Sequence, residues 1–215
     1  MPDAAGAVRD AATVVVVRET PSGPAVLMGR RGADAAFMPS KYVFPGGAVD
    51  PGDEAVALAA PLPEGCRAAL ARRSAVAPET LAAAAIRELH EETGQILGRP
   101  GGGPPWPGFE GMRPDPSALR FVFRAITPPG RSRRFDARFF TAPAEALAGD
   151  PDRLEAPVAE LSDLAWVPVG DARRLDLPFV TAVVLAEVVA RLRGGPGEGV
   201  PVLDNTGPGT EVYRV

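Results

Sequence analysis

The sequence of 215 residues has one cysteine, Cys66, and no long apolar run. A single cysteine cannot form an intrachain disulfide, so we read Cys66 as a small apolar filler and expect a reducing compartment, the cytoplasm. No apolar stretch reaches the roughly 18 residues that a membrane-spanning helix needs, and no charged start precedes a signal-like apolar segment. We therefore expect no membrane partner.

Positive charge and aromatic residues are also scarce. The chain has 23 Lys and Arg against 27 Asp and Glu, a formal net charge of -4, and only 6% aromatic residues. The arginines form local clusters, such as the one at 131–134, and no extended basic run, so we expect no nucleic-acid partner. A hydrophobic content of 46% with 23% charged residues is ordinary for a globular protein of this length. We predict one domain spanning 1–215.

Strand and helix patterns are mixed along the chain without a regular strand–helix–strand alternation, which predicts the α+β class. β-Branched and aromatic runs predict strands at 13–18, 25–30, 41–44, 119–127, 134–141 and 164–169. The first two are expected to form a hairpin, and the last is expected to lie at the centre of the sheet. Helices are predicted near 78–94 and at 178–193. Residues 98–116, rich in Gly and Pro, predict a poorly ordered surface loop. The segment from about 195 predicts a flexible tail that could hold a short strand at 211–215.

The densest acidic cluster lies in the first of these helices, where Glu88, Glu91 and Glu92 follow Arg87. With about 100° between successive helical residues, Glu92 lies about 40° from Glu88, and Glu91 lies about 60° on the other side. Three carboxylates thus share one face, and like charges this close repel each other. The face is either simply solvated or built to hold a cation.

An apolar strand runs into Pro45-Gly46-Gly47 ahead of this helix. Adjacent glycines let the backbone come close to a ligand or metal and turn carbonyl groups toward it, although most such pairs only form turns. Pro78 and Glu79 suit the first turn of the helix, and Gly94 suits a left-handed residue at its end.

Together these segments resemble the signature of the Nudix hydrolases, G-x5-E-x7-R-E-U-x-E-E-x-G-U, in which U is a bulky aliphatic residue. Glu79, seven intervening residues and the run from Arg87 to Gly94 match its second part, and Phe44-Pro45-Gly46-Gly47 matches its start. Gln95 stands at the last aliphatic position. The resemblance implies the Nudix fold, a mixed β-sheet between helices in an α/β/α arrangement.

The two halves of this Nudix box are split. Gly47 and Glu79 are separated by 32 positions (79 − 47) where the pattern has 6, so residues at about 54–78 look like an insertion, and Asp53 occupies the acidic position before the break. A split box is similar to that of the peroxisomal coenzyme A and acyl-CoA diphosphatases, as are the runs at 126–128 and 134–140. Coenzyme A or an acyl-CoA is therefore the favoured substrate. ADP-ribose, NADH or another nucleotide is the alternative, as is a non-catalytic nucleotide-binding module.

The resemblance implies a pyrophosphatase that hydrolyses a nucleoside diphosphate linked to another moiety. Its cofactor would be Mg²⁺ or Mn²⁺, which favour oxygen ligands and neutralise a diphosphate. The implied metal-binding set is Gly46, Gly47, Glu88, Glu91 and Glu92. The implied catalytic set is Arg87, Glu88, Glu91 and Glu160, with Arg87 pairing an acid such as Glu91 or Glu79.

A general base could come from the box or from a later loop, where Glu160 is the first candidate and Glu155 the alternative. Substrate contacts are assigned to Arg30 and Arg31, to Phe44, and to Arg138, although Arg138 could instead form a structural ion pair with Asp136. Trp106 and Phe109 could stack on a base or anchor their loop. His90, at a variable box position, is read as a surface residue. We also consider a homodimer.

Overall fold

The computed structural model describes residues 7–35, 37–104, 106–195 and 198–215. Its main sheet runs in the order β11-β10-β7-β8-β1-β2-β3, with β4 paired to β1 and β9 paired to β2. The pairs β1–β8 and β7–β10 are parallel and the other pairs are antiparallel. The strands are β1 (Val8–Thr20), β2 (Gly23–Arg31), β3 (Tyr42–Val43), β4 (Gly46–Ala48), β7 (Arg120–Ile126), β8 (Arg134–Pro143), β9 (Leu161–Pro168), β10 (Pro201–Asp204) and β11 (Glu211–Arg214).

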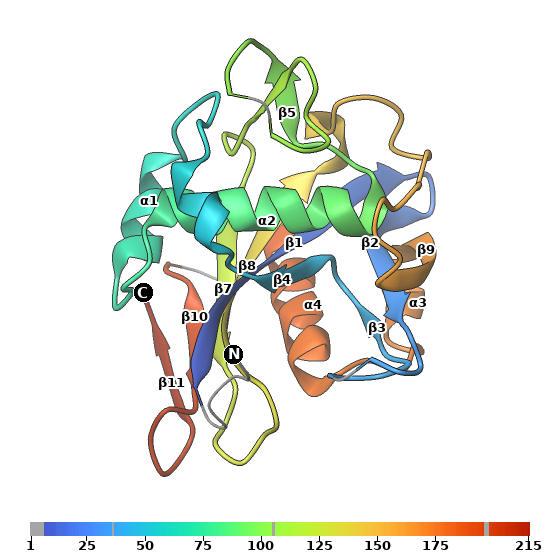
Figure 1. The fold of residues 1–215 in the computed structure, drawn as a ribbon. Coiled ribbons are helices and arrows are strands. Elements are labelled where there is room, and N and C mark those ends of the chain that lie inside the picture. Colours follow the sequence, from blue (N-terminus) through green and yellow to red (C-terminus); the bar gives the residue numbers. More distant parts are fainter. Residues whose placement is uncertain (1–6, 36, 105, 196–197) are drawn as a thin grey trace.

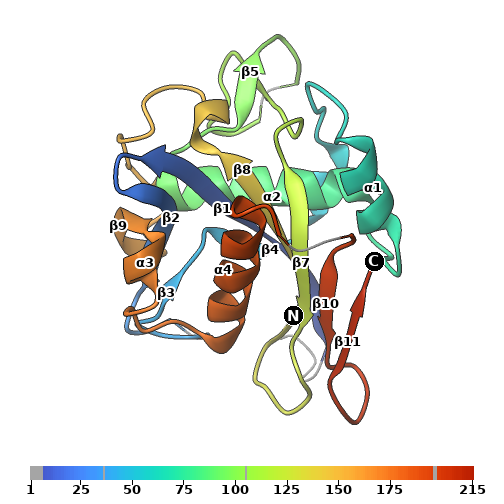
Figure 2. The same cartoon turned by 180° about the vertical axis from the view of Figure 1, so that it is seen from behind.

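The valine run of β1 lies at the centre of this sheet because both faces of the strand are buried. Val14 and Val16 pack into the core cluster under α2 (Pro78–Thr93), whereas Val15 and Val17 pack against α4 (Phe179–Leu192). A strand buried on both faces reads as a continuous apolar run, not as an alternating one. Figures 1 and 2 show α2 on one face of the sheet and α4 on the other. The predicted α+β class and α/β/α arrangement are confirmed.

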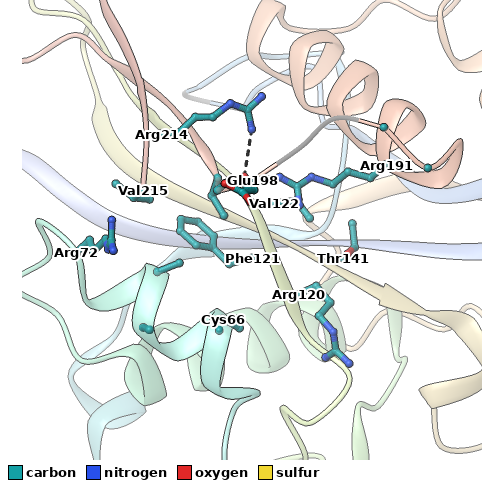
Figure 3. A pocket seen from close by; sticks show the side chains of 17 residues that line it. Cys66, Arg72, Arg120, Phe121, Val122, Thr141, Arg191, Glu198, Arg214 and Val215 are labelled. Atoms are coloured by element: carbon teal, nitrogen blue, oxygen red, sulfur yellow. Dashed lines mark hydrogen bonds between the residues drawn. The ribbon is translucent and has the colours of Figure 1, made fainter.

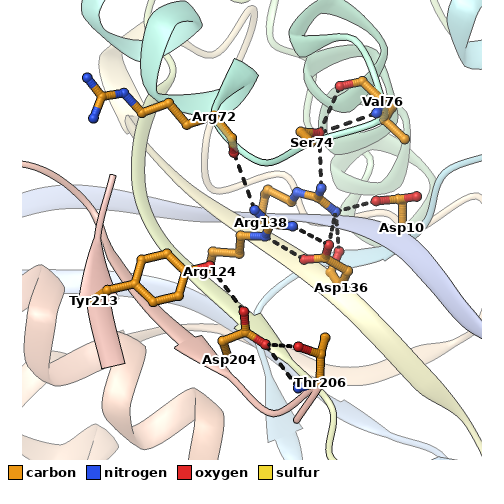
Figure 4. A network of polar contacts seen from close by, with 10 residues as sticks. All are labelled: Asp10, Arg72, Ser74, Val76, Arg124, Asp136, Arg138, Asp204, Thr206 and Tyr213. Carbon is orange, nitrogen blue, oxygen red and sulfur yellow. Dashed lines mark hydrogen bonds and ion pairs between the residues drawn. The ribbon is translucent and has the colours of Figure 1, made fainter. Parts of the chain in front are cut away.

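The segment between Gly47 and α2 forms the 3-10 turn η1 (Pro51–Ala55) and the short helix α1 (Glu64–Ala71), which packs on the first part of α2. A buried polar network attaches it to the sheet (Figure 4). Arg138 of β8 donates to the Ser74 hydroxyl at 3.1 Å, and Arg124 of β7 donates to the Arg72 carbonyl at 3.4 Å. The insertion is therefore tied to the body of the protein by strand arginines.

Residues 98–116 differ from the predicted loop. They form a two-stranded sheet of β5 (Gly98–Pro100) and β6 (Met112–Pro114) above α2 (Figure 1). Phe109 is buried, and its ring lies 4.7 Å from that of Trp106 and 5.5 Å from that of His90. Aromatic packing on α2 orders this segment. His90 packs against Phe109 of the segment and is therefore not a simple surface residue.

Two further expectations differ at the edges of the sheet. In the described part of the chain β9 pairs only with β2, so it is a peripheral strand and not the central one that the sequence predicts. The segment expected as a flexible tail contains β10, because β7 offers a free edge to which β10 adds in parallel, and β11 lies where the sequence predicts a short strand. The short remaining helical segments are α3 (Val169–Ala172) and η2 (Ala144–Ala146). Among the described residues, no helix has the length and apolar character required to cross a membrane.

Candidate active site

Strand β4 brings the backbone of Gly46 against the second half of α2. The Gly46 amide donates to Oε2 of Glu92 at 2.8 Å, and β4 pairs with β1 so that Gly46 lies opposite Thr13. A Cβ atom at Gly46 would lie 2.7 Å from both the Ala12 carbonyl and the Thr13 Cα. Only glycine therefore fits between β1 and the helix at this point.

Gly47 makes an equally close contact with the next carboxylate. A Cβ atom at Gly47 would lie 2.4 to 2.6 Å from the three atoms of the Glu88 carboxylate. The glycine pair of β4 and the glutamates of α2 are far apart in the sequence but lie in contact in the structure.

Arg87 fixes this arrangement by contacts on several sides. Its guanidinium donates twice to Asp53, at 2.9 and 3.0 Å, and once to the Ala48 carbonyl at 2.9 Å. It also donates to Glu88 at 2.9 Å and to Glu91 at 3.1 Å. Burial alone lowers the pKa of Arg87, but the bonds and charges of Asp53 and Glu88 raise it overall. Arg87 therefore joins the η1 turn to the helix carboxylates.

The partner predicted for Arg87 is only half right. Glu91 accepts its hydrogen bond, but Glu79 instead pairs with Arg67 of α1 at 2.8 Å on the surface. Asp53, whose side chain is 1% exposed, takes the acidic position beside Arg87. The sequence placed Asp53 at the acidic position of the box but did not predict its pairing with Arg87. The signal that could have predicted it is the spacing of six between Gly47 and Asp53, which is that of the unsplit pattern.

The buried carboxylates are protonated more readily than free ones. Burial raises the pKa of Glu88 to about 7, with the Arg87 charge opposing this, and burial raises the pKa of Glu92 to about 8, with the Gly46 bond opposing it. The second oxygen of Glu92, Oε1, is buried and has no hydrogen-bond partner among the described residues. Two desolvated carboxylates with an unpaired oxygen are a fitting donor set for a divalent cation.

Within the described residues, no group of three or more His, Cys, Asp and Glu side chains could hold a metal ion by itself. Glu91 and Glu88 each accept a hydrogen bond from Arg87 through one oxygen, and the metal-binding role of Glu91 stays a prediction. Mg²⁺ is commonly held by one or two carboxylates together with waters and substrate phosphates. Glu88 and Glu92, with a carbonyl from the glycine pair, therefore fit a magnesium-type site without a third acid.

Of the two loop acids, Glu160 lies beside this pair. Its charge contributes to the raised pKa of both Glu88 and Glu92, and it lies 3.7 Å from the Arg31 guanidinium. Glu155 pairs with Arg153 at 3.0 Å and is fully exposed, so it is the weaker candidate. Arg31 in turn lowers the pKa of Glu92 by its charge, which places it at the site.

The other residues assigned to substrate lie elsewhere. Arg30 is exposed and donates to the Ser40 carbonyl at 3.3 Å. Phe44 is buried in the core cluster on the α4 side, so it supports β4 from within and offers no surface to a ligand. Arg138 is 1% exposed and is bonded to Asp10, Ser74 and Asp136. Arg138 forms the structural ion pair with Asp136 and does not contact substrate, because its burial leaves no room for a ligand.

No protein-family model and no curated protein sequence matches this chain. Among solved structures, it is similar to a NUDIX hydrolase from Alicyclobacillus acidocaldarius, with 29% identity over 87% of this chain and 93% of that one and a TM-score of 0.64. It is also similar to the NUDIX domain of Shewanella oneidensis NrtR complexed with ADP ribose, with 17% identity, coverage of 89% and 93%, and a TM-score of 0.54. The fold is that of the Nudix hydrolases.

Proposed function

We propose that the chain is a divalent-cation-dependent Nudix pyrophosphohydrolase. The observation that carries this proposal is a pair of carboxylates on α2, the half-buried Glu88 and the buried Glu92, held against the glycine backbone of β4. Among the described residues, Oε1 of Glu92 has no hydrogen-bond partner. Burying such groups in the ionised form is unfavourable unless the charge is compensated, so they hold either protons or a cation, and a divalent cation is what would keep them ionised at neutral pH. The hydrogen bonds of Arg87 to Asp53, Glu88 and Glu91 also argue against a module that only binds nucleotides.

The proposal assigns a role to each residue of the site. Glu88 and Glu92 would hold Mg²⁺ or Mn²⁺, and the bound ion would neutralise a diphosphate and lower the pKa of a water. Arg87 holds Glu88 and Glu91 in place and keeps the η1 turn on the helix. Glu160, close to both metal-binding carboxylates and exposed to solvent, is placed to accept the proton of the attacking water. Arg31 beside it suits a phosphate oxygen.

Coenzyme A or an acyl-CoA is the favoured substrate, on the resemblance of the split box to the coenzyme A diphosphatases. ADP-ribose or NADH is the alternative. The structure adds one observation for the substrate: Trp106 and Met112 line a cavity of about 240 Å³ next to the η1 turn that carries Asp53. A planar base could stack there while its diphosphate lies at the glutamates.

The test is product analysis after incubation with coenzyme A, an acyl-CoA, ADP-ribose, NADH and a dinucleoside polyphosphate, each with Mg²⁺ or Mn²⁺. We expect cleavage of a diphosphate bond, with coenzyme A giving phosphopantetheine and adenosine bisphosphate. Cleavage of ADP-ribose or NADH alone would keep the reaction and replace the substrate. Metal-independent binding without product from any compound would favour the binding module.

A further inference from the structure

A second cavity, of about 970 Å³, lies away from the α2 glutamates (Figure 3). Its walls are α1, the start of β7, and residues 194–195 and 198–200 between α4 and β10, with Arg214 and Val215 on the rim. None of Glu88, Glu91 and Glu92 is among the described residues that line it. One wall of this cavity, made of Gly65, Cys66, Ala68, Ala69 and Arg72, thus belongs to the insertion that splits the box.

The cavity is rich in guanidinium groups. Among the described residues, four arginines line it against the single acidic side chain of Glu198. They are Arg72, which follows α1, Arg120 of β7, Arg191 of α4 and Arg214 of β11. An excess of positive charge at one hollow, in a chain whose formal net charge is -4, indicates a preference for an anion.

These arginines are poorly neutralised. Arg191 pairs with Glu187 at 2.9 Å, but Arg120 donates only to backbone carbonyls, both at 2.9 Å. Arg191 and Arg214 donate to the same carbonyl, that of Gly199, at 3.0 and 3.1 Å. In the described part of the chain, Arg72, Arg120 and Arg214 form no ion pair with a side-chain carboxylate. Their charge is available to a ligand.

The floor between these arginines is apolar. Its accessible part comes from Ala68 and Ala69 of α1 and from Val215, and the side chains of Phe121 and Cys66 beneath it are buried. Figure 3 shows the Phe121 ring lying between the arginine side chains. A ligand that suits both features carries a compact anion for the guanidinium forks and a flat or apolar part for the floor. Phosphate is the anion whose geometry matches guanidinium groups best, and the volume admits a molecule of nucleotide size.

We propose that this cavity is a second ligand site, which binds an organic phosphomonoester of the nucleoside monophosphate class. The site is independent of the proposed hydrolysis, because it uses none of the catalytic or metal-binding residues. Its wall helix α1 contacts the first turn of α2 through the pair of Arg67 and Glu79. A ligand there would order the insertion on the same helix that carries the metal-binding carboxylates.

The experiment is calorimetric titration of the full chain with AMP in EDTA, which removes any cation that could hold a phosphate at the α2 carboxylates. An affinity tag belongs at the N-terminus, because Val215 lies on the cavity rim. We expect saturable binding, at least about tenfold tighter than that of inorganic phosphate, because phosphate alone cannot use the apolar floor. Arg72→Gln with Arg120→Gln should weaken AMP binding at least about tenfold. Arg173→Gln, an exposed arginine outside the cavity, is the matched control and should bind as wild type.

Absence of saturable AMP binding, or equal affinities for AMP and phosphate, would overturn the proposal. So would binding that survives Arg72→Gln with Arg120→Gln but is lost in Glu88→Gln with Glu92→Gln, since AMP would then occupy the active site. If the double arginine variant fails to fold, the wild-type protein still decides the matter. AMP must then shift the NMR signals of the Arg72 and Arg120 side chains, and unshifted signals would contradict the site. Failure here leaves the diphosphate assay untouched.

Discussion

At the scale of single residues, Glu88 and Glu92 make folding sensitive to pH. Their pKa values of about 7 and about 8 in the folded protein lie above the ordinary 4.5, so the folded chain holds protons that the unfolded chain releases. The stability contributed by the protonated pair is full below about pH 4.5 and is lost as the pH rises through 7 to 8. We expect the Tm of the protein in EDTA to fall over this window and Glu92→Gln to flatten the fall. An equal slope in the variant would contradict the burial argument.

The same two carboxylates predict that metal binding releases protons. A cation requires the ionised form, so Mg²⁺ should displace protons near pH 6.5 and few at pH 9. Titration calorimetry in two buffers of different ionisation enthalpy measures the number released. Glu79→Gln, far from the metal-binding pair, should behave as wild type. A proton count that does not change with pH would remove Glu88 and Glu92 as ligands.

Substitutions of Asp53 and Glu79 should differ in their effect on the free energy of unfolding. Asp53→Asn removes the buried carboxylate from Arg87, which should cost roughly 3 kcal/mol in the free energy of unfolding because two charge-assisted hydrogen bonds to a buried carboxylate are lost. Glu79→Gln removes only a surface pair with Arg67, and its unfolding curve should nearly overlay that of wild type. Urea unfolding followed by circular dichroism measures both. The reverse order of effects would restore Glu79 as the partner of Arg87.

At the scale of elements, the contact of β4 with α2 rests on its two glycines in different ways. A side chain at Gly47 meets the mobile end of Glu88, whereas one at Gly46 meets the backbone of β1. Gly47→Ala should therefore displace the carboxylate, weaken Mg²⁺ binding about 10-fold or more, and leave the Tm nearly unchanged. Gly46→Ala should lower the Tm by several degrees. Equal Tm losses in both variants would show that the two glycines serve packing alone.

Elements whose ends and faces are encoded locally are the ones that the sequence predicts well. Helix α2 begins at Pro78 and ends before Gly94, which has φ of +76°, and the valine run of β1 marks a strand buried on both faces. The pairing of Arg87 with Asp53 is harder to predict from sequence, because the insertion at about 54–78 separates the two residues. Only the folded η1 turn brings them together. The same holds for Phe109, whose burial depends on α2, and for β10, whose partner β7 is distant in the chain.

At the scale of the whole molecule, the polar network of Figure 4 joins the sheet to the insertion. Arg124 and Asp136 are paired at 2.6 Å and are 7% and 12% exposed. Asp136→Asn should destabilise the protein by roughly 3 kcal/mol, since two buried arginines lose their shared carboxylate. Limited proteolysis should then cut at 54–76 sooner than in wild type, because Ser74 and the Arg72 carbonyl lose ordered donors. Glu155→Gln, which alters an exposed pair, is the control. Unchanged cleavage would mean that α1 is held by its packing alone.

The most direct test of the account is the rate of diphosphate hydrolysis, followed by ³¹P NMR, on the compound that the wild-type chain cleaves. We predict that Glu92→Gln lowers kcat by roughly 100-fold or more in Mg²⁺, because the buried ligand oxygen is lost. Glu79→Gln should keep the wild-type rate. If Glu92→Gln turns over as fast as Glu79→Gln while remaining folded, the carboxylates of α2 do not hold the catalytic metal, and the proposed function would be contradicted.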